Sequence, residues 1–232
     1  MSGPAPIPME VVARIRSDFP TKFGIPRQSG LVEALRSTVV FEPPYRDPEA
    51  LRGLEGFSHI WLIWQFSGAV REGWSPTVRP PRLGGNVRMG VFATRSPFRP
   101  NPIGLSSVRL EEIRLHTPQG PVLVVSGADL MDGTPILDIK PYLPYGDCRP
   151  EASAGFAGPD GGAVLEVVIP PELEALVPPD KREALRGVLS HDPRPPYQHD
   201  PERVYGMAFA GRDVRFSVEG EVLTVREVLP LP

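Results

Sequence analysis

The chain has 232 residues, of which 41% are hydrophobic and 23% charged, and its formal net charge is -3. These values exclude a disordered or fibrous chain and suit one main domain with a small appendage. The single cysteine, Cys148, excludes an intramolecular disulfide and a cysteine-rich metal cage, and it favours a reducing cytosol. The densest hydrophobic stretch, residues 60–64, is too short to cross a bilayer, and residues 1–8 lack a signal-peptide pattern. We therefore expect a cytoplasmic protein without a membrane role.

Proline is the anomaly of the composition, with 31 prolines beside 23 glycines. Such residues argue against long helices and for short strands joined by shaped loops. Strands are predicted where short runs rich in β-branched or aromatic residues are bounded by Gly or Pro. In chain order, these runs are residues 11–16, 37–41, 59–66, 89–94, 108–115, 121–126 and 163–169. Helical periodicity is scarce before residue 172, which favours a mainly β domain, a barrel or a sandwich, over residues 1–150.

A second domain is indicated by a shift in composition after Tyr145. Residues 146–162 are rich in Gly, Ala, Pro and Asp and predict a loop. We therefore expect a small α+β C-terminal domain over residues 151–232, with a contact to tRNA as one hypothesis for its role.

One helix and a β-meander are predicted inside this second domain. The helix should begin near Asp180, which can cap it while Glu183 returns the hydrogen bond, and it should end near Ser190. Residues 205–228 alternate between apolar and polar, with two glycine turns, as a small β-meander does.

Positive charge is concentrated in one part of the chain. Between Glu72 and Glu111 there is no acidic residue, whereas six arginines occur there: Arg79, Arg82, Arg88, Arg95, Arg99 and Arg109. The planar fork of donors in arginine suits phosphate and carboxylate groups. The alternative is a solvated loop whose charges pair with acids elsewhere in the fold, and we favour contact with an anion or a nucleic acid.

Three segments rich in Gly, Pro and polar residues are candidates for a binding site. The first is the polar turn Pro-Arg-Gln at residues 26–28, for which a plain surface loop is the alternative. The second, residues 79–95, contains paired glycines that allow close approach of a ligand or chain, which alone is a weak signal. The third, residues 99–104, is a stiff turn with two prolines and Asn101, whose amide both donates and accepts.

A fourth segment, residues 129–142, combines a turn with a predicted strand. If residues 136–142 are extended, Asp138, Lys140 and Tyr142 share one face, and a polar triad could face a cleft. The alternative is an exposed ion pair between Asp138 and Lys140 that contributes little.

Other chemistries lack support in the sequence. The four histidines show no zinc-type spacing, so we expect no metal site and interpret the two His-Asp pairs near residues 191 and 199 as loops. The chain contains no G-x-S-x-G elbow, no P-loop and no G-x-G-x-x-G after a strand. Hydrolase, NTPase and dinucleotide-binding functions therefore lose support.

Five motifs in this order resemble the TrmO family, also described as TsaA-like or YaeB-like proteins. They are PRQSG, RGLEGFSHIW, PTVRPPRLGGN, RMGVFATRSPFRPNPIG and MDGTPILDIKPYLP. The resemblance covers nearly all of residues 11–145, and DPRPPY at residues 192–197 resembles the bacterial C-terminal extension. It implies a single-sheet β-barrel rather than a Rossmann fold, a homodimer, and a tRNA N6-methyltransferase. Such an enzyme transfers methyl from S-adenosylmethionine to N6 of threonylcarbamoyladenosine next to the anticodon.

The resemblance also implies which residues bind the cofactor. They are Pro26, Arg27, Gln28, Ser67, Gly68, Arg95, Leu105, Asp132, Gly133, Thr134 and Pro135. Ser67 and Gly68 depart from the bulkier polar residues of many family members, so contacts there would run through the backbone.

The residues suggest roles in the reaction and in RNA binding. We hypothesise that Asp138, alone or in a network with Lys140 and Tyr142, receives the proton that N6 must lose. The residues expected to contact tRNA are Arg79, Arg82, Arg88, Arg99, Asn101 and Tyr197. Tyr142, Tyr145 or Tyr197 could stack on a base splayed from its neighbours.

Two other functions remain open from the sequence. One is a passive RNA-binding β module without a cofactor. The other is a small-molecule methyltransferase, which would use the same cofactor as the tRNA enzyme but would not explain the block of arginines.

Overall fold

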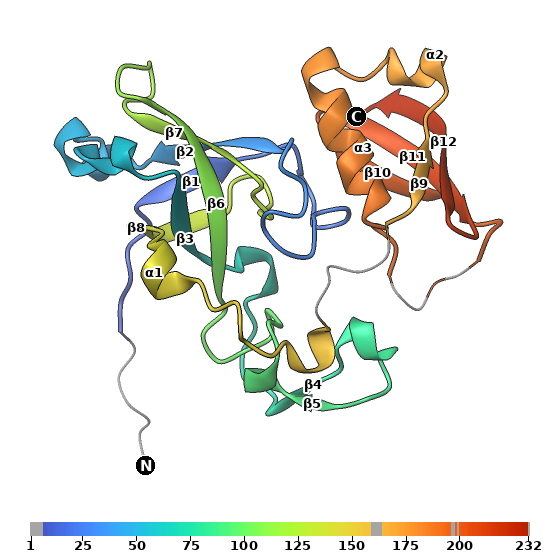
Figure 1. Ribbon diagram of the computed structural model, residues 1–232, viewed down its shortest axis with the longest axis horizontal. Coiled ribbons are helices and arrows are strands. Elements are labelled where there is room, and N and C mark those ends of the chain that lie inside the picture. Colours follow the sequence, from blue (N-terminus) through green and yellow to red (C-terminus); the bar gives the residue numbers. More distant parts are fainter. Residues whose placement is uncertain (1–6, 159–163, 196–197, 199, 232) are drawn as a thin grey trace.

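The computed structural model describes residues 7–158, 164–195, 198 and 200–231. Figure 1 shows a β-barrel, a C-terminal unit of helices packed on a sheet, and an arm between β3 and β6, residues 66–102, that carries a two-stranded sheet. The barrel closes in the order β1, β2, β7, β6, β3 and β8, and every neighbouring pair is antiparallel. Its strands are β1 (Ala13–Arg16), β2 (Arg36–Phe41), β3 (His59–Gln65), β6 (Ile103–Arg114), β7 (Val122–Ser126) and β8 (Pro135–Pro141). The predicted single-sheet barrel is confirmed.

The barrel follows from alternation in its strands. In β3, Ile60, Leu62 and Trp64 are buried, whereas the residues between them are half-buried and face outward. Ala13 and Ile15 of β1 are fully buried in the same core. A closed sheet has no unpaired edge, which suits a chain whose many prolines would weaken open ladders.

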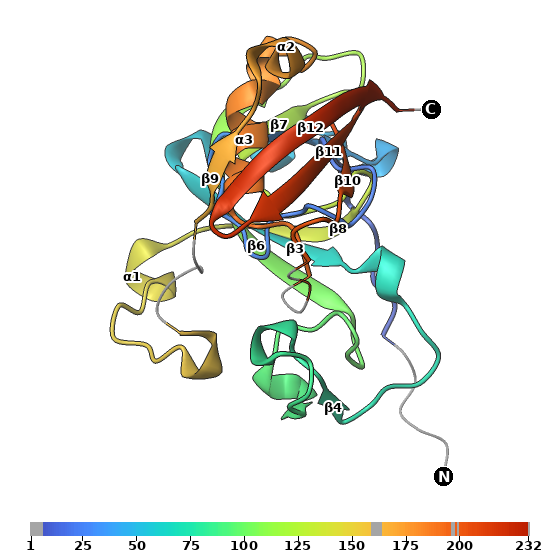
Figure 2. The same ribbon diagram turned by 90° about the vertical axis from the view of Figure 1, so that its right-hand side faces the viewer.

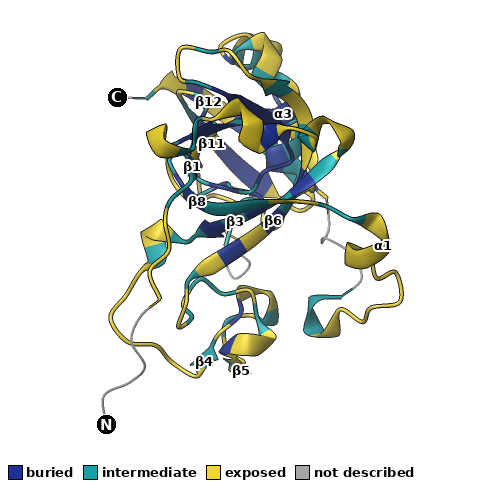
Figure 3. Ribbon diagram, turned by 90° about the vertical axis from the view of Figure 1, so that its left-hand side faces the viewer, coloured by how far each residue is buried: buried dark blue, intermediate teal, exposed yellow. Residues whose placement is uncertain are grey.

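The arm differs from its predicted structure. A strand was expected over residues 89–94, but β5 covers only Met89–Gly90 and pairs with β4 (Thr77–Val78). A 3-10 turn, Val91–Ala93, follows β5 immediately. β6 instead begins at Ile103, before the predicted residue 108, because it pairs with β3 along the whole length of that strand. Figure 3 shows that the arm is largely exposed, unlike the barrel and the C-terminal sheet.

The C-terminal domain is a four-stranded sheet in the order β10, β11, β12 and β9, in which β9 is parallel to β12. Its strands are β9 (Glu166–Val168), β10 (Tyr205–Phe209), β11 (Arg212–Glu219) and β12 (Val222–Pro230), and its helices are α2 (Pro171–Glu174) and α3 (Arg182–Ser190). The helix and the meander are confirmed, but the predicted cap is wrong. Asp180 lies in a 3-10 turn before α3, and Lys181 at the helix start makes no side-chain capping bond.

Short helical turns complete the chain. A short helix, α1 (Pro144–Asp147), follows the barrel. The 3-10 turns are η1 (Pro43–Tyr45), η2 (Pro48–Leu51), η3 (Leu54–Gly56), η4 (Ser67–Ala69), η5 (Pro81–Leu83), η6 (Val91–Ala93), η7 (Gly155–Ala157) and η8 (Pro179–Lys181). Over the described ranges, none of the helices is long and apolar enough to cross a membrane.

The loop between β1 and β2 belongs to the core of the C-terminal domain rather than to the barrel core. Phe19, Val32 and Leu35 from this loop are buried in that second core. The ring of Phe19 lies edge-on to Phe209 with centroids 5.3 Å apart. Figures 1 and 2 show the C-terminal domain beside the barrel, on the side of this loop. The two parts of the chain are therefore joined through residues 17–35.

Candidate functional site

A large cavity lies where the loop between β1 and β2, the arm and the C-terminal domain meet. Its volume is ≈ 2190 Å³, and its walls come from residues 22–31, 69–82, 89–102, 153–158 and 188–195, together with Gln65. Small-ligand sites typically have volumes of roughly 300–1,000 Å³. The cavity therefore has room for a small molecule and part of a larger partner.

Four residues predicted for cofactor binding lie together on this wall: Pro26, Arg27, Gln28 and Arg95. Arg95 donates a hydrogen bond to the side-chain oxygen of Gln28, which links the arm to the turn. Pro26 is buried and stiffens the turn, whereas Arg27 and Gln28 are exposed. The wall thus presents two guanidinium groups and an amide, donors suited to a carboxylate.

The C-terminal domain holds this turn in place. Arg27 reaches the backbone carbonyl oxygens of Asp192 and Arg194, at 3.4 and 3.5 Å. Arg194 is buried and donates two hydrogen bonds to the carboxylate of Asp192, at 2.8 and 2.9 Å, and this contact raises the pKa of Arg194. The ring Nε2 of His191 lies 3.0 Å from the carbonyl oxygen of Leu31. The His191-Asp192 pair therefore makes structural contacts. Within the part of the chain that the structure describes, no cluster of three His, Cys, Asp or Glu residues suits a metal.

A half-buried carboxylate that sequence reasoning missed lies behind the turn. Asp129 follows β7 and accepts a 2.6 Å hydrogen bond from Ser106, whose hydroxyl accepts one of 2.9 Å from the indole of Trp64. Burial raises the pKa of Asp129, against the lowering effects of hydrogen bonds and of Arg95. The signal in the sequence was Ser106 itself, a polar residue on the inward-facing series of β6.

The turn Asp132–Pro135 lies on the barrel beside β1. Ser17 donates its backbone N–H to the carboxylate of Asp132 at 3.0 Å, and Gly133 donates to the carbonyl of Ile15 at 2.9 Å. Thr134 is buried, and its hydroxyl donates to the Met131 carbonyl at 2.7 Å. Among the described residues, those that line the cavity do not include this turn.

The remaining residues predicted for the cofactor lie between these two regions. Ser67 and Gly68 are exposed in a 3-10 turn between Gln65 and Ala69, which both line the cavity. A Cβ on Gly68 would lie 4.0 Å from Met131, next to Asp132. Leu105 is exposed at the start of β6.

The predicted polar triad lies on the outer face of the barrel. Lys140 pairs with Asp138 at 2.8 Å, and the side chains are 64% and 47% exposed, so both meet solvent. The alternation of side chains along β8 is interrupted by a β-bulge at Leu137, one residue before Asp138. Leu137 therefore has no pairing partner on β3. Tyr142 lies just after β8, with its ring 5.6 Å from that of Trp61. The arrangement is an exposed carboxylate beside aromatic side chains.

The arginine block divides among three places. Arg79, Arg82, Arg95 and Arg99 line the cavity. Arg88 is exposed elsewhere on the arm. Arg109, by contrast, lies 3.4 Å from Glu111 on the barrel. Asn101 is exposed in the stiff turn, and Tyr197 lies outside the described residues.

Two exposed aromatic side chains on the arm were also missed. Trp74 and Phe92 both line the cavity, are 55% and 73% exposed, and have ring centroids 6.1 Å apart. Tyr145, one of the three tyrosines considered for stacking on a base, is exposed on α1. Large apolar rings beside arginines are typical of surfaces that bind unpaired bases.

Comparison with known families matches both domains. Residues 14–148 match the tRNA-methyltransferase O N-terminal domain, and residues 163–231 match the TrmO C-terminal domain. The two matches together cover most of the chain.

Individual relatives agree with the family match. The chain is 45% identical over 217 residues to the tRNA (adenine(37)-N6)-methyltransferase of Escherichia coli (strain K12). This match covers 90% of this chain and 92% of that protein. It is 50% identical over 174 residues to the protein of the same name from Eikenella corrodens, covering 75% and 97% of the two chains. A crystal structure of TrmO from Pseudomonas aeruginosa superposes with a TM-score of 0.78 at 34% identity, over 99% of both chains.

Proposed function

Because the chain belongs to the TrmO family, we propose that it methylates N6 of threonylcarbamoyladenosine next to the anticodon of tRNA. It is an S-adenosylmethionine-dependent tRNA (adenine-N6)-methyltransferase, like the relatives that it resembles. One observation carries the proposal: a single large cavity is lined both by the Pro26–Gln28 turn with Arg95 and by further arginines of the arm.

The residues of the cavity suit S-adenosylmethionine. The guanidinium groups of Arg27 and Arg95 and the amide of Gln28 can receive the carboxylate of its methionine part. When bound, the cofactor supplies an electrophilic methyl group on a sulfonium. We also propose as further cofactor contacts the other family-implied residues, which are not among the described residues that line the cavity: Ser67, Gly68, Leu105, Asp132, Gly133, Thr134 and Pro135.

The acceptor nitrogen must lose a proton during the transfer. Its lone pair is delocalised into the purine and into the carbamoyl group, so N6 is a poor nucleophile and a base assists attack. We propose Asp138, held by Lys140 and flanked by Tyr142, as this base or as the group that orients it. Its exposed carboxylate supports the proposal, because RNA can reach the outer face of the barrel directly.

The tRNA contacts are proposed along the arm. Arg79, Arg82, Arg88 and Arg99, with Asn101, would bind anticodon-stem phosphates or the threonyl carboxylate. Tyr197 is a further proposed contact from the C-terminal domain, at a residue outside the described part of the chain. The volume of the cavity supports this arrangement, since it exceeds what the cofactor alone requires.

We further propose that the protein is a cytoplasmic homodimer. Exposed apolar side chains on and beside the arm support self-association: Val70, Val87, Ile103 and Leu105. The cytoplasmic location is proposed because tRNA is the substrate.

The deciding experiment measures transfer of radiolabelled methyl groups to two tRNA preparations. One carries the threonylcarbamoyl group and the other comes from cells unable to add it. We expect methylation of the first only, at N6 of the modified adenosine. Equal labelling of both would overturn the threonylcarbamoyl specificity, and labelling of neither would contradict the proposed reaction.

A further inference from the structure

A chain of hydrogen bonds runs from the barrel core to a carboxylate that the proposed reaction does not use. The indole N–H of Trp64 on β3 donates to the Ser106 hydroxyl on β6 at 2.9 Å. That hydroxyl donates to Oδ1 of Asp129 at 2.6 Å. Trp64 and Ser106 are 6% and 1% exposed, so neither group can exchange its partner for water without opening the barrel. Two strands thus fix the position of the Asp129 carboxylate.

The other side of this carboxylate faces the cofactor turn. The positive charge of Arg95 and the backbone N–H of Ser29, directly after Gln28, both favour its ionised form and lower its pKa. Arg95 in turn donates to the side chain of Gln28. The carboxylate therefore lies between the rigid barrel and two exposed residues of the cavity wall.

A second connection holds the turn beside Asp129. Gly30 donates its N–H to the carbonyl of Gly127 at 2.8 Å. Gly127 has φ +75°, and a Cβ there would lie 3.2 Å from the Cα of Gly30. Only glycine allows the two backbones to approach this closely. The approach brings Ser29 within reach of the carboxylate.

Burial makes this carboxylate costly for folding. Desolvation raises the pKa of Asp129, and the hydrogen bond from Ser106 and the charge of Arg95 only partly oppose it. Arg95 is the charged group that acts on it, whereas Ser106 and Ser29 are neutral donors. A folded-state pKa above the ordinary value means that the stabilising contribution is present at low pH and is lost as pH rises through the folded-state pKa. At neutral pH the ionised group therefore destabilises the fold, which is typical of functional groups.

We propose that Asp129 is a positioning residue for cofactor binding, which holds Arg95 and the turn at Pro26–Gln28 in the geometry that receives the carboxylate of S-adenosylmethionine. Asp129 acts through Arg95 and Ser29 rather than by touching the cofactor. The inference rests on the proposed function, because it requires that the cavity binds this cofactor. Without the carboxylate, Arg95 would lose the negative charge that attracts it and would keep only its hydrogen bond to Gln28.

The test compares full-length wild type with Asp129→Asn for binding of S-adenosylmethionine by calorimetry and for KM and kcat with modified tRNA. We expect affinity for the cofactor to fall and its KM to rise by about tenfold to a hundredfold, because charge-assisted hydrogen bonds are lost. We expect kcat at saturating cofactor to change much less. The melting temperature at pH 7 should not fall, since the variant removes a partly desolvated charge.

A pH series distinguishes positioning from structure. Affinity of wild type for the cofactor should fall as pH drops through the raised pKa of Asp129, and Asp129→Asn should lack this acid limb. Ser106→Ala should move the limb to higher pH, because it removes the hydrogen bond that lowers the pKa. If the affinity of Asp129→Asn for the cofactor still falls at low pH as that of wild type does, the proposal is overturned.

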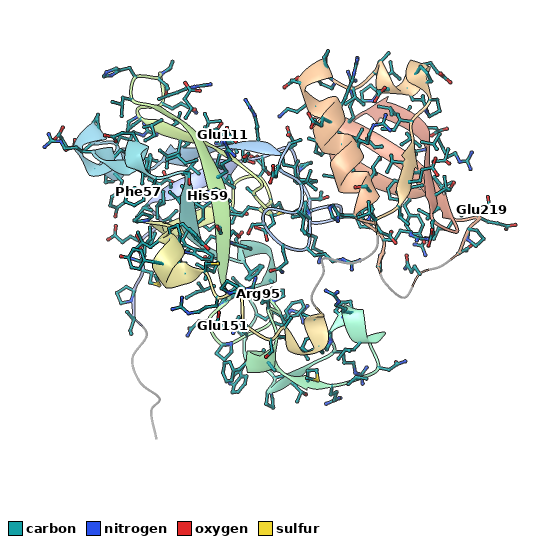
Figure 4. The ribbon with its side chains drawn as sticks, in the orientation of Figure 1. Phe57, His59, Arg95, Glu111, Glu151 and Glu219 are labelled. Atoms are coloured by element: carbon teal, nitrogen blue, oxygen red, sulfur yellow. The ribbon has the colours of Figure 1, made fainter. Side chains whose placement is uncertain are left out.

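Glu111→Gln is the matched control. Glu111 also accepts a serine hydroxyl hydrogen bond, from Ser126 at 2.7 Å, but it lies at the other end of the barrel from Arg95 (Figure 4). Its replacement should leave cofactor affinity unchanged. If Asp129→Asn binds the cofactor as tightly as wild type, or loses affinity only in step with melting temperature, the positioning role is wrong. If wild type itself does not bind the cofactor, the proposed function fails instead.

Discussion

At the scale of single residues, the packing around Gly104 leaves no space for a larger side chain. Gly104 at the start of β6 lies against the indole of Trp64, and a Cβ at this position would lie only 2.3–2.6 Å from the nearest indole atoms. The indole cannot withdraw, because its N–H is bound to Ser106 in the barrel core. The glycine of the PNPIG motif is therefore required for packing within the strand.

We predict that Gly104→Ala destabilises the protein by about 1–3 kcal/mol, the usual cost of overpacking a core. Denaturant unfolding measures the free energy. Gly56→Ala is the control, because a Cβ at Gly56 meets open space, and its effect should stay within about 0.5 kcal/mol. Equal stability of the two variants would contradict the packing described for Trp64.

At the same scale, Asp138→Asn should lower the single-turnover rate by about 10²-fold or more, because it removes the proposed base. Affinity for the cofactor should remain nearly intact. Asp213→Asn is the control, since Asp213 forms the same kind of pair, two residues apart, with Arg215 at 3.0 Å on β11. An unchanged rate for Asp138→Asn would remove this residue from the mechanism.

At the scale of elements, the arm carries the charge that is proposed to bind RNA. Replacing Arg79 by Gln should lower the slope of log affinity for tRNA against log salt by about one unit, because one phosphate contact is lost. Arg114→Gln is a matched control, because Arg114 is paired with Glu112 at 2.7 Å on the far end of β6. Filter binding at several salt concentrations measures both slopes. An unaltered slope for Arg79→Gln would show that the arm does not bind phosphate.

The loop between β1 and β2 is the element that couples the two domains. Phe19 is 1% exposed and packs against Phe209, and Lys181 of the C-terminal domain pairs with Asp18 at 2.8 Å. Phe19→Ala should therefore cost about 3–5 kcal/mol of stability. It should also weaken cofactor binding, because the same loop carries the turn at residues 26–28. Calorimetric melting and binding test both, with the exposed Phe92→Ala as the stability control. If Phe19→Ala lowers neither the stability nor the affinity for the cofactor, the coupling of the two domains is contradicted.

Most barrel strands could be predicted from the sequence because they are short runs rich in β-branched or aromatic residues and bounded by Gly or Pro. The arm could not, because residues 89–94 are apolar enough for a strand yet have only the two residues of β4 to pair with. Asp129 was missed for a different reason. Its importance depends on Ser106 and Arg95, which are distant in sequence and meet only in the folded barrel.

At the scale of the whole molecule, the exposed apolar side chains on and beside the arm predict that the protein self-associates. Sedimentation equilibrium should give twice the chain mass of 25.4 kDa. Leu105→Glu should shift the protein toward monomer, because it places a charge among exposed apolar side chains. A wild-type protein that remains monomeric at high concentration would contradict the proposed dimer.

The central claim is that one cavity, between the loop at residues 22–31 and the arm, binds the methyl donor. The most direct measurement is a crystal structure of the protein with S-adenosylhomocysteine. We predict electron density for the ligand beside Arg27, Gln28 and Arg95, with its carboxylate at the guanidinium groups. Density elsewhere on the protein, or none at saturating ligand, would contradict the account.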